Sequence, residues 1–338
     1  MTSKYSQKPI RILVSQTALV DLTSRLERRT NFSYELLSSA DISPGAEFDV
    51  ALISRDVTST STKQKIKPST QAFYDLLLGS KDLNWVQLHS AGADRHIYLD
   101  LMKRGVVISG SSGVNAQIVT QNAIAGVLML ARDFPKMLKA QSEKRWDSLI
   151  NHPLPPDLSG QTAVILGRGP IGNGIAQILC LFGLHVIRVG FTQRVDHVAG
   201  VDIEDRHFSE LRDVLPKANW LILACPLSKE TRHCINKETI TLLPNAAHLI
   251  NIARGEIICE PDLIDALIAK KLAGAYLDVF ASEPLDPDSP LWSMDKVIVT
   301  PHSAGHSLGN ESRVLDLFVE NVLRYAQGEV LKNTIKTP

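Results

Sequence analysis

A short apolar strand that runs directly into a glycine loop constrains the fold of this chain more than any other feature. The strand is Ala163-Val-Ile-Leu166, the loop is Gly167-Arg-Gly-Pro-Ile-Gly172, and a helix-like stretch follows. In such a GxGxxG loop the glycines permit a tight turn, a close approach to a pyrophosphate and close helix–strand packing. The first helical turn also offers free N–H groups to a phosphate. The pattern predicts a dinucleotide-binding α/β sheet, rather than a glycine turn that only joins strand to helix, with contacts from the whole loop: Gly167, Arg168, Gly169, Pro170, Ile171 and Gly172.

Apolar strand-like runs alternate with helix-like stretches along most of the chain. The predicted strands are residues 10–14, 49–53, 85–89 and 106–109, then 162–166, 185–189, 220–224, 248–252, 273–279 and 296–300. The predicted helices are residues 71–78, 171–182, 208–215 and 261–271, with a long helical region over 115–144 and a closing helix over 309–328. Strand, helix, strand at this spacing is typical of right-handed crossovers. We therefore expect an α/β chain with doubly wound parallel sheets.

The composition narrows the function classes. The chain has 338 residues, enough for about two domains. Its 36 basic and 36 acidic side chains balance, so we expect no nucleic-acid partner. No apolar run approaches the roughly 20 residues of a membrane span, and the N-terminus does not resemble a signal peptide. The four cysteines show no CxxC spacing, so we expect reduced cysteines, no metal and a cytoplasmic location.

The residue after the second cofactor strand bears on the choice of dinucleotide. An NAD enzyme places an Asp or Glu there to accept the ribose hydroxyls, but this chain has Gly190. Without that carboxylate a 2′-phosphate meets no repulsion, and Thr192 and Arg194 follow as candidate hydrogen-bond donors to it. We therefore expect NADP(H) to be favoured over NAD(H). The alternative is that Gly190 only shortens the turn and either cofactor is accepted.

Three late segments carry candidate catalytic residues. Residues 251–255, 277–284 and 300–302 each follow a predicted strand, at the edge of the sheet where ligands bind. They contain Arg254, Glu283 and His302. A histidine can exchange a proton near neutral pH, a nearby carboxylate favours its protonated form, and an arginine can pair with a substrate carboxylate. Each residue alone is more often structural, but together, behind a dinucleotide loop, they suit hydride transfer to a 2-keto acid.

These motifs make a specific set. With residues 225–231, 290–292 and 320–328, they resemble those of the D-isomer-specific 2-hydroxy-acid dehydrogenases, from about residue 50 to the end. The resemblance implies a Rossmann dinucleotide domain (112–303) inserted into a flavodoxin-like substrate domain (1–111 and 304–338). It implies that Arg254 binds substrate and polarises its carbonyl, that His302 is the acid/base, and that Glu283 holds and tunes His302.

The resemblance also implies binding residues. The expected cofactor contacts, besides the glycine loop, Thr192 and Arg194, are Cys225, Pro226, Thr231, Ile252, Ala253 and Asp278. The backbone N–H groups of Ala91 and Gly92 would hold the substrate carboxylate, with Arg55 and Asn115 as further candidates. One departure concerns Phe191, which stands where NADP-using members commonly carry Arg, although Arg194 matches a second basic position.

The expected activity is that of a glyoxylate or hydroxypyruvate reductase-like enzyme acting on a small 2-keto or 2-hydroxy acid. The expected assembly is a homodimer formed through the cofactor domain. The alternative of another class is a non-catalytic, dinucleotide-sensing protein of the corepressor type, which would not need Arg254, Glu283 and His302 together.

Overall fold

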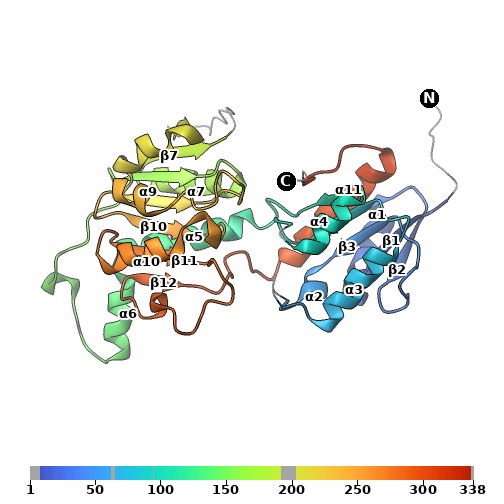
Figure 1. The fold of residues 1–338 in the computed structure, drawn as a ribbon, viewed down its shortest axis with the longest axis horizontal. Helices are drawn as coiled ribbons and strands as arrows, with labels where there is room; N and C mark the ends of the chain where they lie inside the picture. Colours follow the sequence, from blue (N-terminus) through green and yellow to red (C-terminus); the bar gives the residue numbers. More distant parts are fainter. Residues whose placement is uncertain (1–7, 62–64, 94, 192–202, 336–338) are drawn as a thin grey trace. The chain divides into compact units, whose positions relative to one another are not determined.

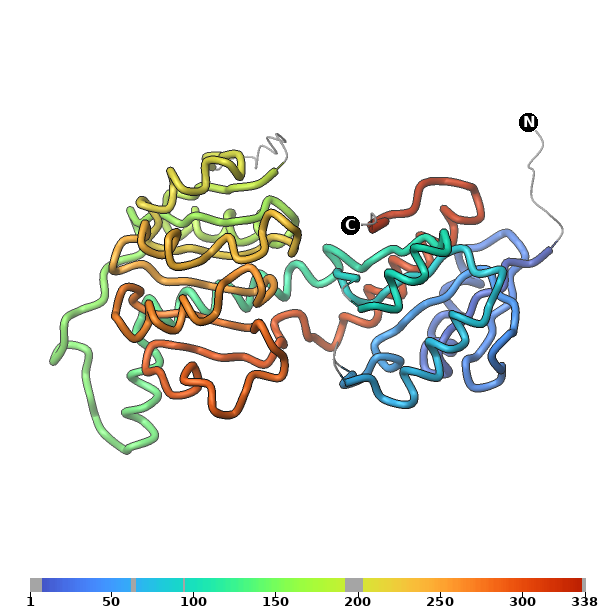
Figure 2. The backbone as a smooth tube through the Cα atoms, in the orientation of Figure 1, coloured from blue at the N-terminus to red at the C-terminus, as the bar shows by residue number. Residues whose placement is uncertain are grey.

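The chain divides into two compact units. The computed structural model describes residues 8–61, 65–93, 95–191 and 203–335. One unit comprises the chain up to Asn115 and from Ser307 onward, and the other comprises Ala116–His306. Figure 2 follows the chain out of the first unit, through the second and back. Among the described residues, no helix is both long and apolar enough to cross a membrane.

The first unit is built on a parallel sheet with the strand order β2-β1-β3-β4-β5. This is the flavodoxin-like order. The strands are β1 (Ile10–Val14), β2 (Tyr34–Ser38), β3 (Val50–Ile53), β4 (Trp85–Leu88) and β5 (Val107–Ser109). The helices are α1 (Gln16–Arg29), α2 (Arg55–Thr58), α3 (Pro68–Gly79), α4 (His96–Lys103) and α11 (Asn310–Gln327).

Helices cover both faces of this sheet (Figure 1). Side chains of α3 and α4 pack into one core cluster, and those of α1 and α11 pack into a second. The central strands β3 and β4 are buried at every position. Burial on both faces explains why these strands are continuous apolar runs in the sequence.

The second unit is built on a seven-stranded parallel sheet with the order β12-β11-β10-β9-β6-β7-β8. This is the Rossmann order with one strand added. The strands are β6 (Thr162–Leu166), β7 (His185–Gly190), β8 (Ile203–His207), β9 (Trp220–Leu223), β10 (His248–Asn251), β11 (Gly274–Leu277) and β12 (Val297–Val299). The helices are α5 (Ala116–Ala131), α6 (Phe134–Ser142), α7 (Pro170–Leu181), α8 (Leu211–Val214), α9 (Lys237–Leu242) and α10 (Glu260–Ile268). The helices α5 and α7 share one core cluster, whereas α8, α9 and α10 share the other.

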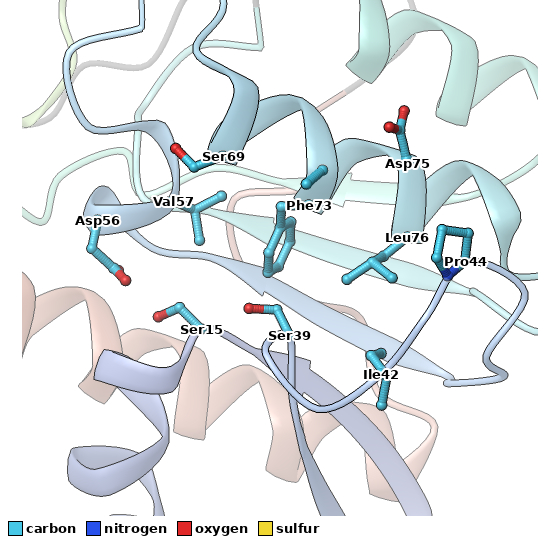
Figure 3. Close-up of a pocket in the computed structure, with 11 residues that line it drawn as sticks. Ser15, Ser39, Ile42, Pro44, Asp56, Val57, Ser69, Phe73, Asp75 and Leu76 are labelled. Atoms are coloured by element: carbon cyan, nitrogen blue, oxygen red, sulfur yellow. The ribbon is translucent and has the colours of Figure 1, made fainter.

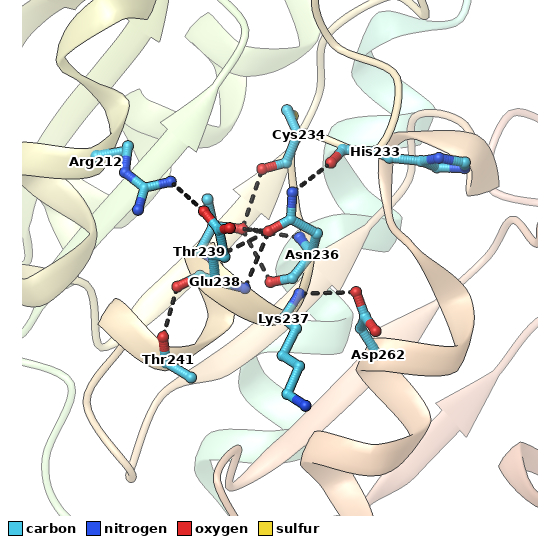
Figure 4. A network of polar contacts seen from close by, with 9 residues as sticks. All are labelled: Arg212, His233, Cys234, Asn236, Lys237, Glu238, Thr239, Thr241 and Asp262. Carbon is cyan, nitrogen blue, oxygen red and sulfur yellow. Dashed lines mark hydrogen bonds and ion pairs between the residues drawn. The ribbon is translucent and has the colours of Figure 1, made fainter.

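A capping network holds the short helix α9 (Figure 4). The Asn236 side chain accepts hydrogen bonds from the backbone N–H groups of Glu238 (3.1 Å) and Thr239 (3.2 Å). The backbone N–H of Lys237 donates to Asp262 Oδ2 on α10 at 2.8 Å. Since the first N–H groups of a helix have no partner within it, these acceptors stabilise the start of α9 and tie it to α10.

Several elements differ from the sequence-based prediction, in which the helices α1, α2, α4 and α9 were not named. The long helical region 115–144 is two helices, α5 and α6, separated at Asp133, whose φ of 55° ends a right-handed helix. The predicted helix 208–215 is a four-residue α8 between the 3₁₀ turns Phe208–Glu210 and Leu215–Lys217. The strands β2 and β8 were not predicted. Each is an edge strand with several polar or charged side chains, as edges often have.

Candidate active site

The glycine loop forms a cradle between two strands. It follows β6, and α7 begins after Gly169. A Cβ on Gly167, whose φ is 127°, would lie 2.4 Å from the Ala224 carbonyl oxygen, and one on Gly172 would lie 2.1 Å from the Gly167 oxygen. A Cβ on Gly169 would meet nothing within 4 Å. The loop therefore packs tightly at both ends and is open in its middle.

The position of this cradle suits a dinucleotide. The strand order of the sheet reverses between β6 and β9, and ligands bind outside the carboxyl ends of strands at such a point. Pro170 occupies the first turn of α7, where its missing N–H costs nothing. The open backbone at Gly169 and the start of α7 fit a pyrophosphate.

The side chain of Arg168 crosses the end of β7. A Cβ on Gly190 would lie 3.1–3.3 Å from Cγ, Cδ and Nε of Arg168. Next along the chain, Phe191 stacks on Phe208 with ring centroids 4.3 Å apart. Thr192 and Arg194, both expected to contact the cofactor, lie outside the described residues.

The loop after β9 contains Cys225, Pro226 and Thr231. Burial raises the pKa of the Cys225 thiol to about 12, so it stays neutral. Thr231 is fully buried: its hydroxyl donates to the Pro226 carbonyl (2.9 Å) and accepts from the Ser228 N–H (2.7 Å). The Thr231 side chain shapes the loop from within, and the expected contact between Thr231 and the cofactor stays a prediction.

Arg254 follows β10 in a tightly fixed turn. Asn251 is fully buried, its amide donates to the Arg254 carbonyl (3.1 Å), and its Oδ1 accepts from the Ala253 N–H (3.1 Å). Ile252 and Ala253 are buried within this turn. A Cβ on Gly255 would lie 1.9 Å from the Phe280 carbonyl carbon, so this position requires glycine. The close contact between these backbones brings Arg254 near the loop that carries Glu283.

His302 and Glu283 form a direct pair. Nδ1 of His302 lies 2.7 Å from Oε2 of Glu283, and Oε1 of Glu283 accepts the Phe280 N–H at 3.1 Å. Burial acts to raise the pKa of Glu283. The hydrogen bond and charge of His302, the Phe280 N–H and the charge of Arg254 oppose it, and the net pKa is lowered. Glu283 is therefore a carboxylate, while the His302 side chain is half exposed.

Asp278 organises the segment that carries His302. Its Oδ1 accepts from the Thr300 hydroxyl (2.6 Å) and the Ser303 N–H (2.8 Å), and its Oδ2 accepts from the Ala304 N–H (3.0 Å). Its backbone carbonyl accepts the His302 N–H at 2.8 Å. Asp278 is only 2% exposed, and hydrogen bonds are stronger in such a buried environment than in water. They therefore fix the geometry of the segment that carries His302. Asp278 holds the backbone on both sides of His302.

The predicted substrate-binding residues of the first unit follow its strands β3, β4 and β5. Ser90 donates its hydroxyl to the Gly92 carbonyl (2.9 Å), and the Ser90 carbonyl accepts the Ser111 N–H (2.8 Å). A Cβ on Gly110 would lie 2.7 Å from the Ala91 oxygen. These contacts fix the loop of Ala91 and Gly92. Arg55 is exposed at the start of α2, and Asn115 directly precedes α5.

A pocket of about 330 Å³ lies at the carboxyl ends of β1, β2 and β3 (Figure 3). Ser15, Ser39 and Asp56 line its polar side, and Phe73 and Leu76 of α3 line its apolar side. None of the predicted substrate-binding residues lines it. This pocket was not predicted, because its lining comes from four separate segments of the chain: Ser15, the loop after β2, α2 and α3.

The sequence analysis also missed a buried ion pair beneath the cofactor loop. Arg188 on β7 is 1% exposed and donates to both carboxylate oxygens of Asp205 on β8, at 3.0 and 2.8 Å. A signal was present, since an arginine inside an apolar strand is almost always paired. Its partner was hidden because β8 was not predicted.

A Rossmann sheet with a glycine cradle and an Arg–Glu–His set at the same carboxyl edge defines a dinucleotide-dependent oxidoreductase. Residues 124–304 match the family model "D-isomer specific 2-hydroxyacid dehydrogenase, NAD binding domain". The glyoxylate reductase of Thermofilum pendens is 30% identical over 258 residues, 76% of each chain. The chain belongs to the D-isomer specific 2-hydroxyacid dehydrogenase family, and its cofactor is a nicotinamide dinucleotide.

Solved structures agree over nearly the whole chain. A D-isomer specific 2-hydroxyacid dehydrogenase family protein from Aeromonas salmonicida has a TM-score of 0.78 and 28% identity, covering 98% of this chain and 100% of the other. A D-isomer specific 2-hydroxyacid dehydrogenase from Xanthobacter autotrophicus, in complex with NADPH and MES, has a TM-score of 0.75 and 27% identity, covering 98% and 99%. The two-domain α/β fold expected from the sequence is confirmed.

Proposed function

We propose that this oxidoreductase reduces a small 2-keto acid, such as glyoxylate or hydroxypyruvate, to the 2-hydroxy acid, and catalyses the reverse reaction. The observation that carries the proposal is the hydrogen-bonded pair of His302 and Glu283, with Arg254 close enough for its charge to act on that pair. The glyoxylate reductase relative supports the substrate class. The unit Ala116–His306 binds the dinucleotide, and the other unit supplies substrate contacts.

The chemistry assigns one role to each residue. The bound nicotinamide supplies the hydride. With Nδ1 held by Glu283, Nε2 of His302 donates the proton to the keto oxygen in reduction and accepts it in oxidation. Glu283 holds and orients the imidazole through this contact. Arg254 pairs with the substrate carboxylate and polarises the adjacent carbonyl. The N–H groups of Ala91 and Gly92 are the further proposed carboxylate donors, and Arg55 and Asn115 are further proposed substrate contacts.

We propose that NADP(H) is favoured over NAD(H). Gly190 supplies no carboxylate to repel a 2′-phosphate, and the cationic side chain of Arg168 crosses the same place. The Xanthobacter relative was solved with NADPH. The remaining proposed cofactor contacts are Gly167, Gly169, Pro170, Ile171, Gly172, Cys225, Pro226, Ile252, Ala253 and Asp278.

A panel assay tests the activity. We expect the purified protein to oxidise NADPH when glyoxylate or hydroxypyruvate is added, followed by the loss of nicotinamide absorbance. His302→Gln should lower kcat by about 100-fold or more, because a general acid contributes roughly 10²–10⁴-fold. Cofactor binding, followed by fluorescence, should stay within a few-fold of wild type.

Two results would contradict this proposal. Turnover of His302→Gln near that of wild type would remove His302 from proton transfer. Tight NADPH binding with no turnover of any 2-keto acid would instead favour a dinucleotide-sensing protein.

We further propose a homodimer formed through the cofactor-binding unit. Between α6 and β6 this unit carries large apolar side chains that lie almost fully in solvent: Trp146 is 98% exposed, Ile150 80% and Leu154 69%. Clustered exposed apolar side chains of this kind mark protein–protein contact sites. A cytoplasmic location is also proposed from the sequence, because its four cysteines show no CxxC spacing.

A further inference from the structure

We propose that Arg168, inside the glycine loop, recognises the 2′-phosphate of NADP(H), and that the buried Arg188–Asp205 pair positions it for this task. This inference rests on the proposed preference for NADP(H) and assigns that preference to a residue. It differs from the expectation based on the sequence, which placed the phosphate contacts at Thr192 and Arg194.

The side chain of Arg168 lies at the end of β7, next to Gly190. In NAD enzymes of this fold, the side chain at the end of the second strand binds the adenosine ribose hydroxyls. Here that position is Gly190, and a Cβ on it would be within 3.1–3.3 Å of the Arg168 side chain. The side chain of Arg168 therefore lies where the ribose-binding carboxylate of an NAD enzyme starts. A cation replaces an anion at the point where the two dinucleotides differ.

Two contacts with β8 hold Arg168 in this position. Its Nε lies 3.4 Å from Asp205 Oδ1, and its Nη2 donates to the backbone carbonyl of Arg206. Both contacts are on β8, which pairs with β7 directly beside Gly190. Since two anchors on one strand restrain the side chain, little rotamer entropy remains to be lost when a ligand binds.

Arg188 contacts the same carboxylate as Arg168, under the loop. Arg188 donates to both oxygens of Asp205 and, through Nη1, to Asn173 Oδ1 at 2.6 Å. Two guanidinium groups thus share the carboxylate of Asp205. The side chains of Arg168 and Arg188 are only 10% and 1% exposed. Because water screens such charges poorly, the Arg168 guanidinium attracts an anion more strongly than a surface arginine would.

The guanidinium group of Arg168 is chemically suited to bind a phosphate. A guanidinium has five N–H donors in a plane that matches phosphate oxygens, so it can bridge a protein carboxylate and a phosphate at once. The neighbouring Phe191, which stands where NADP-using members of the family commonly carry Arg, stacks on Phe208 and offers no charge. Arg168 is the cation that the described residues place at Gly190.

Binding of two nucleotides without a nicotinamide tests the assignment. The ligands are adenosine 2′,5′-bisphosphate and AMP, which differ by the 2′-phosphate, and calorimetry gives their Kd values. We expect wild type to prefer the bisphosphate. Arg168→Met, which keeps the length of the side chain without its charge, should weaken the bisphosphate by about 10- to 100-fold and AMP by less than about 3-fold, as loss of a charged hydrogen bond implies. Arg168→Lys should recover part of the loss.

Arg212→Met is the matched control. Arg212 is an exposed arginine of the same unit, paired with Glu238, and its replacement should leave both Kd values unchanged. Thermal melting confirms that each variant is folded.

The outcomes separate this inference from the proposed function. If Arg168→Met weakens both nucleotides equally, Arg168 only braces the loop and the inference is wrong. If wild type prefers the bisphosphate and Arg168→Met keeps that preference, the inference fails while the proposed NADP(H) preference stands. If wild type binds both nucleotides equally, the NADP(H) preference fails and the inference fails with it.

Discussion

At the scale of single residues, Glu283 keeps its charge against the effect of its partial burial. Burial acts to raise its pKa, but His302, the Phe280 N–H and Arg254 together bring that pKa below its usual value. Glu283 is consequently negative throughout the neutral range. This places a negative group 2.7 Å from Nδ1 of His302, the proposed proton donor in reduction.

Glu283→Gln should move the pH–rate profile for keto-acid reduction to lower pH. The neutral amide can still accept a hydrogen bond from Nδ1 of His302, but the negative charge 2.7 Å from that ring nitrogen is removed. The measurement is kcat/KM for the keto acid across the pH range of the folded enzyme. Glu238→Gln, an exposed glutamate on α9, should leave the profile unchanged. An unshifted profile for Glu283→Gln would argue against the pairing.

Some of these residues could be found from the sequence and others could not. Arg254, Glu283 and His302 were predicted because each follows a strand of a parallel sheet and has a side chain suited to the reaction. The Arg188–Asp205 pair was missed because only one of its two strands was predicted. Arg188 lies in the mostly apolar β7, whereas Asp205 lies in the mostly charged β8. The inward direction of the Thr231 hydroxyl was not predicted, because a motif shows which residues recur but not which way they point.

At the scale of elements, prediction succeeded for the apolar strands, including the edge strands β5 and β12, and failed for two polar edge strands and one helix break. A central strand such as β9 is buried at all positions and therefore stands out as an apolar run. The edge strands β2 and β8 contact water along one side and carry polar side chains, which hide them. The break between α5 and α6 depends on a left-handed conformation at Asp133, and no glycine marks it.

The contact between the turn after β10 and the loop after β11 is an element-scale feature that can be tested. Gly255→Ala would place a methyl group 1.9 Å from the Phe280 carbonyl carbon, and backbone cannot yield as a side chain can. We expect a loss of about 3 kcal/mol in the free energy of unfolding, at the upper end of overpacking costs. We also expect kcat to fall at least about 10-fold, because Arg254 moves relative to Glu283.

Thermal melting and steady-state kinetics measure both effects. Gly309→Ala is the comparison, since its added methyl would meet only the end of the flexible Arg313 side chain, and it should melt near wild type. If Gly255→Ala melts and turns over like wild type, the close packing at Phe280 does not position Arg254.

At the scale of the whole molecule, both sheets gather their candidate residues at the carboxyl ends of parallel strands. In one unit the cradle, Arg254, Glu283 and His302 all follow strands, and in the other Arg55, Ala91 and Gly92 do so. Alternation in the sequence was enough to predict this, because parallel strands place every strand-to-helix loop at the same edge. It could not predict how chains associate, since an exposed apolar residue looks the same in sequence as a buried one.

The exposed segment between α6 and β6 makes the proposed dimer testable. Wild type should elute at twice the 37.2 kDa chain mass in size-exclusion chromatography with light scattering. Ile150→Lys should shift it toward the monomer, because an unpaired buried charge costs about 3 kcal/mol or more, which is more than 100-fold in the dissociation constant. Leu181→Lys is matched closely, since Leu181 is 81% exposed and Ile150 is 80% exposed in the same unit. Because Leu181 belongs to α7, away in sequence from the apolar segment, it should stay dimeric. A wild-type monomer, or dissociation by Leu181→Lys but not by Ile150→Lys, would place the interface elsewhere or remove it.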